Sequence, residues 1–305
     1  MKSLCFFSSY SIQSAVTYYI KFYLEELSKH FTDVVLLTNE RDINIADMEY
    51  LKARNIQLLL VKNEGYDFGM WYKGFKAFDV YAYDRVGLVN DSAILFKSLD
   101  ATFEWINKNN LDYCGLVDSN SIKYHIQSYF VIINKNAIKP TADYFEQTGI
   151  VNGYNEVIKA YEIGLSNYLL NLGLTMGAVY NKRHTITDRN PSFFIINDLI
   201  NEGIPMIKKK IIFRSYRLGD YLTWFRTNFN IDPRYYIAAI KEANKNSEII
   251  DFDKVIKDAG YDKSYASIYV YKSILAIYKI ASKFTLFRYL FHRLIDIKRF
   301  FNIKF

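Results

Sequence analysis

Hydrophobic and polar positions along the first 120 residues alternate between two kinds of pattern. Short apolar runs with the length of strands are separated by segments in which apolar residues recur every three or four positions, as on one face of a helix. The alternation predicts a mostly parallel sheet flanked by helices, an α/β fold of Rossmann-like type. The predicted strands are Lys2–Ser8, Asp33–Thr38, Ile56–Val61, Arg85–Val89 and Asp112–Val117. The predicted helices are Gln13–Lys29, Ala46–Arg54, Asp67 to about Phe78, and Ala101–Asn107.

The pattern changes after Asp118, where strands and helices no longer alternate regularly. Strands are predicted at Ser128–Ile133 and Thr175–Tyr180, and helices at Glu156–Asn171 and Pro191–Asn201. From Tyr216 onward the sequence is helical in character throughout. We therefore expect one α/β domain over residues 1–215 and a helical C-terminal region over residues 216–305.

The net charge of +7 is unevenly distributed along the 305 residues. Residues 263–305 contain nine Lys or Arg and a single acidic residue, a net charge of +8, which leaves −1 for the rest of the chain. In this tail Phe287, Phe291 and Phe301 fall on one helical face, and basic residues fall on the other. A basic amphipathic helix rich in Phe is typical of an anchor on an anionic membrane surface. Alternatively, this helix packs on its own domain or on a second subunit.

The charge distribution also argues against nucleic-acid binding, because a body with a net charge of −1 lacks the distributed basic groove that a phosphate backbone requires. The N-terminal segment does not have the pattern of a signal peptide, and no run reaches the roughly 18 apolar residues of a spanning helix. We therefore expect a cytoplasmic protein that is peripheral on a membrane surface.

Two motifs about twenty residues apart point to a ligand site. The first is N-E-G-Y-D-F-G-M-W-Y-K-G, Asn63–Gly74, in which a polar loop opens a helix. Gly65 and Gly69 allow close approach of the backbone, and Asn63 and Asp67 supply polar contacts beside the free N–H groups of a helix start. Alternatively, Asp67 is only the cap of that helix.

The second motif is Asn90-Asp91-Ser92, which ends a predicted strand. Ligands of open α/β sheets bind outside the carboxyl ends of the strands. A carboxylate among small polar residues at that edge suits a divalent cation that carries phosphates. Alternatively, N-D-S is only a turn.

In this order the two motifs resemble those of nucleotide-sugar glycosyltransferases of the GT-A type. More closely, the chain resembles the rhamnan synthesis protein F family of bacterial polysaccharide biosynthesis over roughly residues 1–215. The sequence departs from the family pattern at Ser8-Ser9-Tyr10, where a His-Tyr pair is expected. The stretches that carry the resemblance are N-E-G-Y-D-F-G (63–69), V-N-D-S (89–92), G-L-V-D-S (115–119), H-I-Q-S-Y-F (125–130), Y-E-I-G-L-S-N-Y-L-L-N-L-G (161–173), N-P-S-F-F (190–194) and G-I-P-M-I-K (203–208).

The resemblance implies an inverting transferase on the inner face of the bacterial plasma membrane, in which Asp91 holds Mg²⁺ or Mn²⁺ on the diphosphate of the donor. Alternatively, the transferase is independent of metal, or Asp91 forms a hydrogen bond to the donor sugar or to ribose. The resemblance also implies that Glu162 is the general base that takes the proton of the acceptor hydroxyl, with Asp118 as the second candidate. Alternatively, Glu162 is only a surface acid of a helix. His125 and Gln127 are expected to contact the acceptor sugar, although His125 could be a core residue.

The substrates implied by the resemblance are a nucleotide-sugar donor, such as dTDP-rhamnose, and a lipid-linked or growing glycan as acceptor. The competing hypothesis is a non-catalytic module derived from a transferase, which binds glycan or acts as a scaffold.

Overall fold

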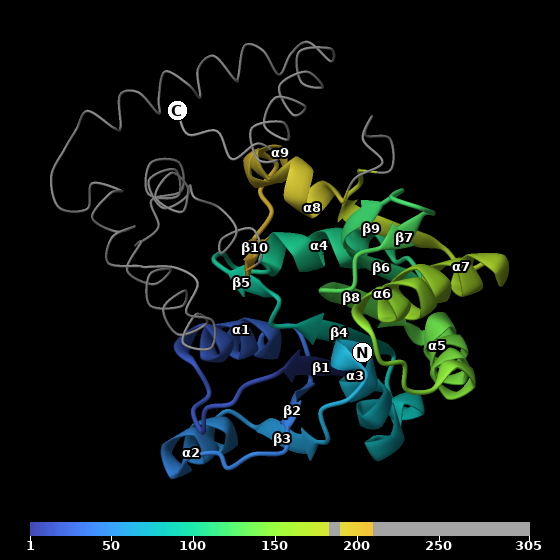
Figure 1. Ribbon diagram of the computed structural model, residues 1–305. Coiled ribbons are helices and arrows are strands. Elements are labelled where there is room, and N and C mark those ends of the chain that lie inside the picture. The colour runs from blue at the N-terminus through green and yellow to red at the C-terminus, as the bar shows by residue number, and fades with distance from the viewer. Residues whose placement is uncertain (183–189, 210–305) are drawn as a thin grey trace, which may run out of the picture. The chain divides into compact units, whose positions relative to one another are not determined.

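The computed structural model describes residues 1–182 and 190–209, which belong to one compact unit, Met1–Ile211. Figure 1 shows the arrangement of its helices and strands. The predictions for residues 216–305, including the amphipathic tail, lie outside the described residues. None of the helices in the described part of the chain combines the length and apolar character that a membrane span needs.

The main sheet has the strand order β3-β2-β1-β4-β8-β6-β7, and β9 pairs with β6. Strands β1 to β4 are parallel, β8 runs antiparallel to both β4 and β6, and β9 is parallel to β6. The order reverses at β1, because β2 and β3 lie on one side of it and β4 on the other. These strands are β1 (Ser3–Ser9), β2 (Asp33–Asn39), β3 (Ile56–Val61), β4 (Arg85–Asn90), β6 (Tyr113–Ser119), β7 (His125–Ile126), β8 (Phe130–Asn134) and β9 (Met176–Tyr180).

A second, two-stranded sheet pairs β5 (Ala93–Leu95) with β10 (Met206–Lys208) in antiparallel orientation. Figure 1 shows β10 beside β5, although the two are more than 100 residues apart in the sequence. This pairing returns the end of the described chain to the segment that directly follows β4.

Helices connect the strands in the order that the sequence pattern predicts, which confirms the α/β fold. The helices before residue 110 are α1 (Tyr18–Ser28), α2 (Ile45–Ala53), α3 (Tyr66–Ala77), the short 3₁₀ helix η1 (Val80–Ala82) and α4 (Asp100–Asn109). The later helices are α5 (Lys135–Thr148), α6 (Tyr154–Val157), α7 (Gly164–Asn171), α8 (Pro191–Phe194) and α9 (Ile196–Asn201).

Three features of these later helices differ from the sequence pattern. The predicted single helix at Pro191–Asn201 is two short helices, α8 and α9, which Ile195 separates. Helix α5 was not predicted, and it contains Pro140, which removes one backbone donor from the helix. The predicted single helix at Glu156–Asn171 is α6, a π-helical segment η2 (Ile158–Ile163) and α7 in succession. Such wide turns re-aim side chains and are frequent at functional sites.

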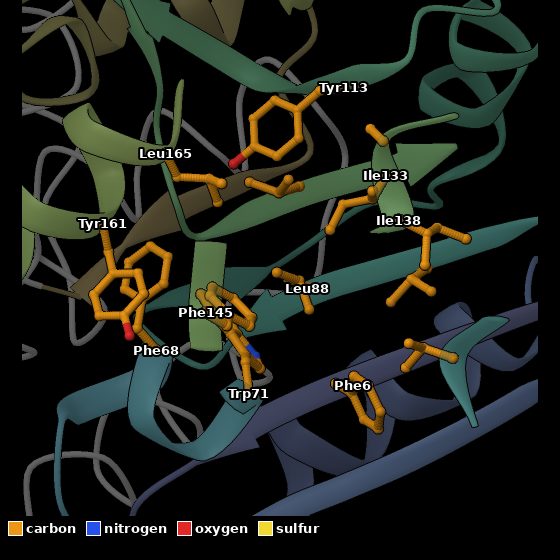
Figure 2. Packing of buried hydrophobic residues seen from close by; sticks show 14 of the residues in the cluster. Phe6, Phe68, Trp71, Leu88, Tyr113, Ile133, Ile138, Phe145, Tyr161 and Leu165 are labelled. Carbon is orange, nitrogen blue, oxygen red and sulfur yellow. The ribbon is translucent and has the colours of Figure 1, made fainter. Parts of the chain in front are cut away.

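The hydrophobic core between the main sheet and α3, α5 and η2 is rich in aromatic side chains from these helices. The rings of Phe68 and Tyr161 are stacked with centroids 4.8 Å apart, and Trp71 meets Phe68 edge-on at 4.9 Å. Phe145 of α5 packs edge-on against Tyr161 at 5.5 Å. Figure 2 shows these four rings gathered together. Because all four are buried, the packing fixes α3 relative to the π-helical segment.

Candidate functional site

The loop before α3 is fixed by its own packing. Gly65 has φ +72° and Tyr66 has φ +55°, so two consecutive residues adopt the left-handed conformation. A Cβ at Gly69 would lie 2.0 Å from the carbonyl oxygen of Glu64, which only glycine avoids. Gly65 donates its backbone N–H to Asn152 Oδ1 at 3.0 Å. Both glycines therefore have a structural reason to be present.

Asp67 lies in the first turn of α3 and faces the carboxyl ends of β1 and β4. Its Oδ1 accepts a hydrogen bond from Ser8 Oγ at 3.0 Å, and its Oδ2 accepts one from Asn90 Nδ2 at 2.8 Å. Burial and the negative charge of Asp91 raise the pKa of Asp67 to about 7, against the opposing hydrogen bonds and the charge of Lys209. Asp67 is therefore partly protonated near neutral pH. It is not the cap of α3, because Gly65 holds the N-cap position.

Asp91 lies one residue beyond β4 and carries the most connected carboxylate of this edge. Its Oδ2 accepts hydrogen bonds from Ser9 Oγ at 3.0 Å and from Tyr19 OH at 3.2 Å. Lys209 Nζ forms an ion pair with the same oxygen at 2.9 Å and a hydrogen bond with Tyr19 OH at 2.8 Å. The Asp91 and Lys209 side chains are 15% and 18% exposed, so the pair is partly open to solvent and is not sealed in the core.

The electrostatics of this group keep Lys209 charged. Burial alone would lower the pKa of Lys209, but Asp91 and Tyr19 outweigh it and raise that pKa. Burial, together with the charge of Asp91, raises the pKa of Tyr19 to about 12, so its hydroxyl stays protonated. The group is therefore a cation held by a carboxylate and a neutral phenol.

The third residue of the predicted motif shapes the turn. Ser92 donates its backbone N–H to Asn90 Oδ1 at 3.0 Å, and its carbonyl accepts the N–H of Lys209 at 2.7 Å. The motif is thus both a turn and part of the polar cluster. Asn63, by contrast, is exposed at the surface, and the structure does not bring it into this cluster.

A second polar cluster surrounds Glu162 on the π-helical segment. Glu162 Oε2 accepts hydrogen bonds from Ser128 N at 3.0 Å and from Ser128 Oγ at 2.5 Å. Its Oε1 lies 3.4 Å from His125 Nε2, while His125 Nδ1 lies 2.8 Å from the Lys123 carbonyl oxygen. A carbonyl oxygen only accepts, so His125 donates through Nδ1 and, when protonated, through Nε2 as well.

The protonation of this cluster is set by its hydrogen bonds. Burial alone would raise the pKa of Glu162, but His125, the charge of Lys208 and Ser128 outweigh it and lower that pKa to about 2. Burial alone would lower the pKa of His125, but Glu162 and the Lys123 carbonyl raise it. At neutral pH Glu162 is an ionised carboxylate with a side chain that is 12% exposed, and His125 behind it is buried.

The two clusters are joined by main-chain and ring contacts. Asn90 donates its backbone N–H to the Tyr129 carbonyl at 3.2 Å, and Tyr129 directly follows Ser128. Phe68 and Tyr161, the stacked pair of Figure 2, directly follow Asp67 and directly precede Glu162. The acidic groups of α3 and η2 therefore belong to one rigid edge of the fold.

The other predicted site residues are buried beside these clusters. Asp118, at the end of β6, is fully buried, and its carboxylate accepts the backbone N–H of Lys182. Gln127 is fully buried as well, and its Oε1 accepts a hydrogen bond from Ser192 Oγ at 2.7 Å. Of the two candidate bases, Glu162 is the more accessible. The acceptor contacts of His125 and Gln127 stay predictions.

Sequence reasoning missed the partners that surround these carboxylates. Ser8 and Ser9 appeared in it only as a departure from a family pattern. Tyr19 had no motif of its own, and Ser128 stood in the family motif H-I-Q-S-Y-F without a role. Lys208 ended a family motif without a role, and Lys209 was not considered. The K-K-K run at 208–210, directly after a short apolar strand, was the available signal.

The residues around Asp91 suit a divalent cation poorly. Lys209 already places a positive charge on Asp91 Oδ2, and both oxygens of Asp67 are engaged by Ser8 and Asn90. A divalent ion about 4 Å from the ammonium group would be repelled by about 8 kcal/mol at an effective dielectric constant of about 20. Within residues 1–182 and 190–209, no three His, Cys, Asp or Glu side chains group as metal ligands. The Mg²⁺ or Mn²⁺ site stays a prediction, and we derive no step through it.

Comparison with solved structures gives distant likenesses in fold. A candidate nucleotide-diphospho-sugar transferase from Desulfovibrio desulfuricans G20 is 16% identical with a TM-score of 0.39, over 66% of this chain and 95% of that one. A 4-diphosphocytidyl-2C-methyl-D-erythritol synthase from Anaerococcus prevotii DSM 20548 is 10% identical with a TM-score of 0.41, over 66% and 95%. A cytidylyltransferase from Leptospira borgpetersenii is 14% identical with a TM-score of 0.38, over 67% and 88%.

Sequence comparisons are more decisive. A comparison with curated proteins finds no match. The family model described as rhamnan synthesis protein F matches residues 34–272, which is most of the chain and includes Asp67, Asp91, Glu162 and Lys209. The resemblance stated from the motifs is confirmed, and the chain belongs to the rhamnan synthesis protein F family.

Proposed function

We propose that the protein is a glycosyltransferase that moves a sugar from a nucleotide diphosphate donor to a lipid-linked or growing bacterial glycan. The observation that carries the proposal is the pair of polar clusters at one edge of the sheet. One lies at the carboxyl ends of β1 and β4, where the strand order reverses and open α/β sheets bind their ligands. The other presents an ionised carboxylate, Glu162.

The reaction we propose is a single inverting displacement. The acceptor hydroxyl oxygen attacks the anomeric carbon as the bond from that carbon to the diphosphate oxygen breaks, and the nucleoside diphosphate leaves with the bonding electrons. Glu162 takes the proton of the hydroxyl. A carboxylate with a pKa of about 2 is a weak base, so it acts late, when the forming bond has made the hydroxyl strongly acidic.

Ser128 and His125 hold the base in place. Ser128 fixes one carboxylate oxygen with two hydrogen bonds, and His125 lies behind the other. Of the two oxygens, Oε1 has the longer contact, 3.4 Å from His125, and it is the one we assign to the acceptor proton. Asp118 is the second candidate, but it is fully buried and already accepts an N–H group.

Asp91 supports the donor side in this proposal. The family description concerns rhamnan synthesis, so rhamnose carried by dTDP is the donor that we would test first. The competing hypothesis, a non-catalytic glycan-binding or scaffolding module, predicts that no donor is consumed.

The test is turnover by the purified full chain with dTDP-rhamnose and a panel of other nucleotide sugars. Release of nucleoside diphosphate is followed with and without a lipid-linked glycan acceptor. Release that depends on the acceptor supports the proposal. If no nucleotide sugar of the panel is consumed under any condition, while the folded protein binds glycan, the non-catalytic hypothesis is preferred.

We also propose that the protein is peripheral on a membrane, through the basic tail at residues 263–305. This proposal rests on charge alone: each basic residue near an anionic surface contributes about 1 kcal/mol. Sedimentation with anionic vesicles, for the full chain and for a chain that ends before Lys263, tests it. Equal sedimentation of the two would remove the tail from the proposal.

A further inference from the structure

The two lysines at the end of β10 reach both polar clusters at once. Lys208 pairs with Ala93 of β5, and the N–H of Lys209 is bonded to the Ser92 carbonyl. Lys208 ends β10 and Lys209 directly follows it, so the pairing with β5 holds both lysines at the turn that follows Asn90.

Lys209 is the cation of the polar cluster around Asp91 and Tyr19. Its Nζ lies 2.9 Å from Asp91 Oδ2 and 2.8 Å from Tyr19 OH, and 4.8 Å from the centre of the Tyr19 ring. Asp91 is fixed in turn by Ser9, so Asp91 and Tyr19 together hold the ammonium group in place. This is the place, beside the carboxylate that ends β4, where the sequence motif predicts a divalent ion.

Lys208 acts on the polar cluster around Glu162 and His125. Its Nζ lies 4.6 Å from the centre of the Tyr129 ring, and its charge acts on both Glu162 and His125. Tyr129 is bonded through its carbonyl to the N–H of Asn90. Lys208 thus acts by its charge on the carboxylate that we assign as the base, and it contacts Tyr129, which is bonded to the first residue of the Asn90-Asp91-Ser92 turn.

We propose that Lys208 and Lys209 bind the diphosphate of the nucleotide donor, and that the Lys209 ammonium group takes the position of the divalent cation, so that donor binding needs no metal. The inference rests on the proposed function and specifies its donor site. A diphosphate gains negative charge as it leaves, and two fixed ammonium groups offset that charge without a metal ion. Asp91 then orients Lys209 and does not bind a metal.

The test is the binding of dTDP, UDP and thymidine to the full chain by calorimetry, in EDTA and in Mn²⁺. We expect wild-type affinity for the diphosphates to differ less than twofold between the two conditions. Thymidine, which lacks the phosphates, should bind at least tenfold more weakly than dTDP in EDTA. These wild-type measurements test the inference even if a variant fails to fold.

Variants then separate the two lysines. In EDTA, Lys209→Met should weaken dTDP binding at least tenfold, and Mn²⁺ should restore part of the loss because Asp91 is freed to hold a metal ion. Lys208→Met should also weaken binding, with no response to Mn²⁺. Lys52→Met, at an exposed position on α2, is the matched control and should bind as the wild type does. Circular dichroism confirms that each variant is folded.

Two results would overturn the inference while the proposed function stands: binding of dTDP only when Mn²⁺ is present, or unchanged binding by a folded Lys209→Met protein. Failure of the wild-type chain to bind any nucleoside diphosphate in either condition would instead count against both the inference and the proposed function. The two failures are therefore distinguishable in one set of titrations.

Discussion

The carboxyl of Asp67 should make the stability of the protein fall as the pH rises toward neutrality. Its pKa is raised to about 7 in the folded state, whereas an Asp in an unfolded chain has a pKa of about 3.9. Between these values the folded state binds more protons than the unfolded state does. The free energy of unfolding therefore falls with pH, and the stabilising contribution is lost as the pH rises through about 7.

The size of the effect follows from the difference between the two pKa values. About three pH units at about 1.4 kcal/mol per unit give a ceiling of about 4 kcal/mol for the whole range. Between pH 5 and pH 8 the same arithmetic gives a fall of roughly 2–3 kcal/mol. The pKa of His125 is raised as well, so His125 also lowers the free energy of unfolding as the pH rises. A variant is therefore needed to isolate the contribution of Asp67.

Asp67→Asn is that variant, because it keeps both hydrogen bonds. The amide oxygen can accept from Asn90 Nδ2, and the amide nitrogen can donate to Ser8 Oγ, which then acts as acceptor. The variant has no carboxyl to titrate, so its stability should depend less on pH by roughly 2–3 kcal/mol between pH 5 and pH 8. Asp42→Asn, at an exposed position, is the control.

The assay is urea unfolding at several pH values between 5 and 8, followed by tryptophan fluorescence. Trp71 is a suitable probe, since it is fully buried on the same helix as Asp67. The difference between the wild-type and Asp67→Asn curves is the quantity of interest, and the control should show none. Parallel curves for the wild type and Asp67→Asn would show that Asp67 does not titrate in this range, and the reasoning on its burial would be wrong.

Three further predictions concern the base and the loop before α3. Glu162→Gln should lower turnover by about 10²–10⁴ with dTDP affinity unchanged; a loss below tenfold would favour Asp118. Ser128→Ala removes a hydrogen bond to the Glu162 carboxylate, so its pKa rises above about 2 and the acid limb of the pH–rate profile should move to higher pH. Gly69→Ala places a Cβ 2.0 Å from a backbone oxygen and should lower the free energy of unfolding by about 1–3 kcal/mol, measured by urea unfolding; no change would mean that the loop relaxes freely.

The parallel half of the fold could be predicted because each element there carries its own local signal. Strands β1 to β4 are short apolar runs bounded by polar residues, and their carboxyl ends place Asp91 at the predicted edge. Helix α5 escaped prediction because Pro140 stands inside it, and a proline normally marks a helix boundary. The π-helical segment escaped because the hydrophobic period continues through it with little change.

The partners of the site could not be predicted, because they are brought together only by pairing between distant segments. Lys209 meets Asp91 across 118 positions of sequence, through the antiparallel pair of β5 and β10. Strand β5 has only three residues, too few to show a period. Local pattern therefore indicated Asp91 but not Lys209, its ion-pair partner, and the Mg²⁺ or Mn²⁺ ion expected beside Asp91 stays a prediction.

The edge of the sheet gives its three accessible or half-buried carboxyl groups three different environments. Glu162 is surrounded by donors, which lower its pKa to about 2, whereas burial beside Asp91 raises the pKa of Asp67 to about 7. Asp91 is matched to one ammonium group. When the surroundings give neighbouring carboxyl groups different pKa values, one group can act as an acid and another as a base within a single site.

The rigidity of that edge matters as much as its charges. The stacked rings of Phe68 and Tyr161 connect the residue after Asp67 to the residue before Glu162, as Figure 2 shows. A transferase needs its base and its leaving-group site at a fixed separation, since a misplacement of about 1 Å can cost about 10²-fold in rate. The aromatic core thus does more than stabilise the fold: it holds Glu162, which we assign as the base, at a set distance from Asp67, and Asp67 is hydrogen-bonded to Asn90, the residue before Asp91.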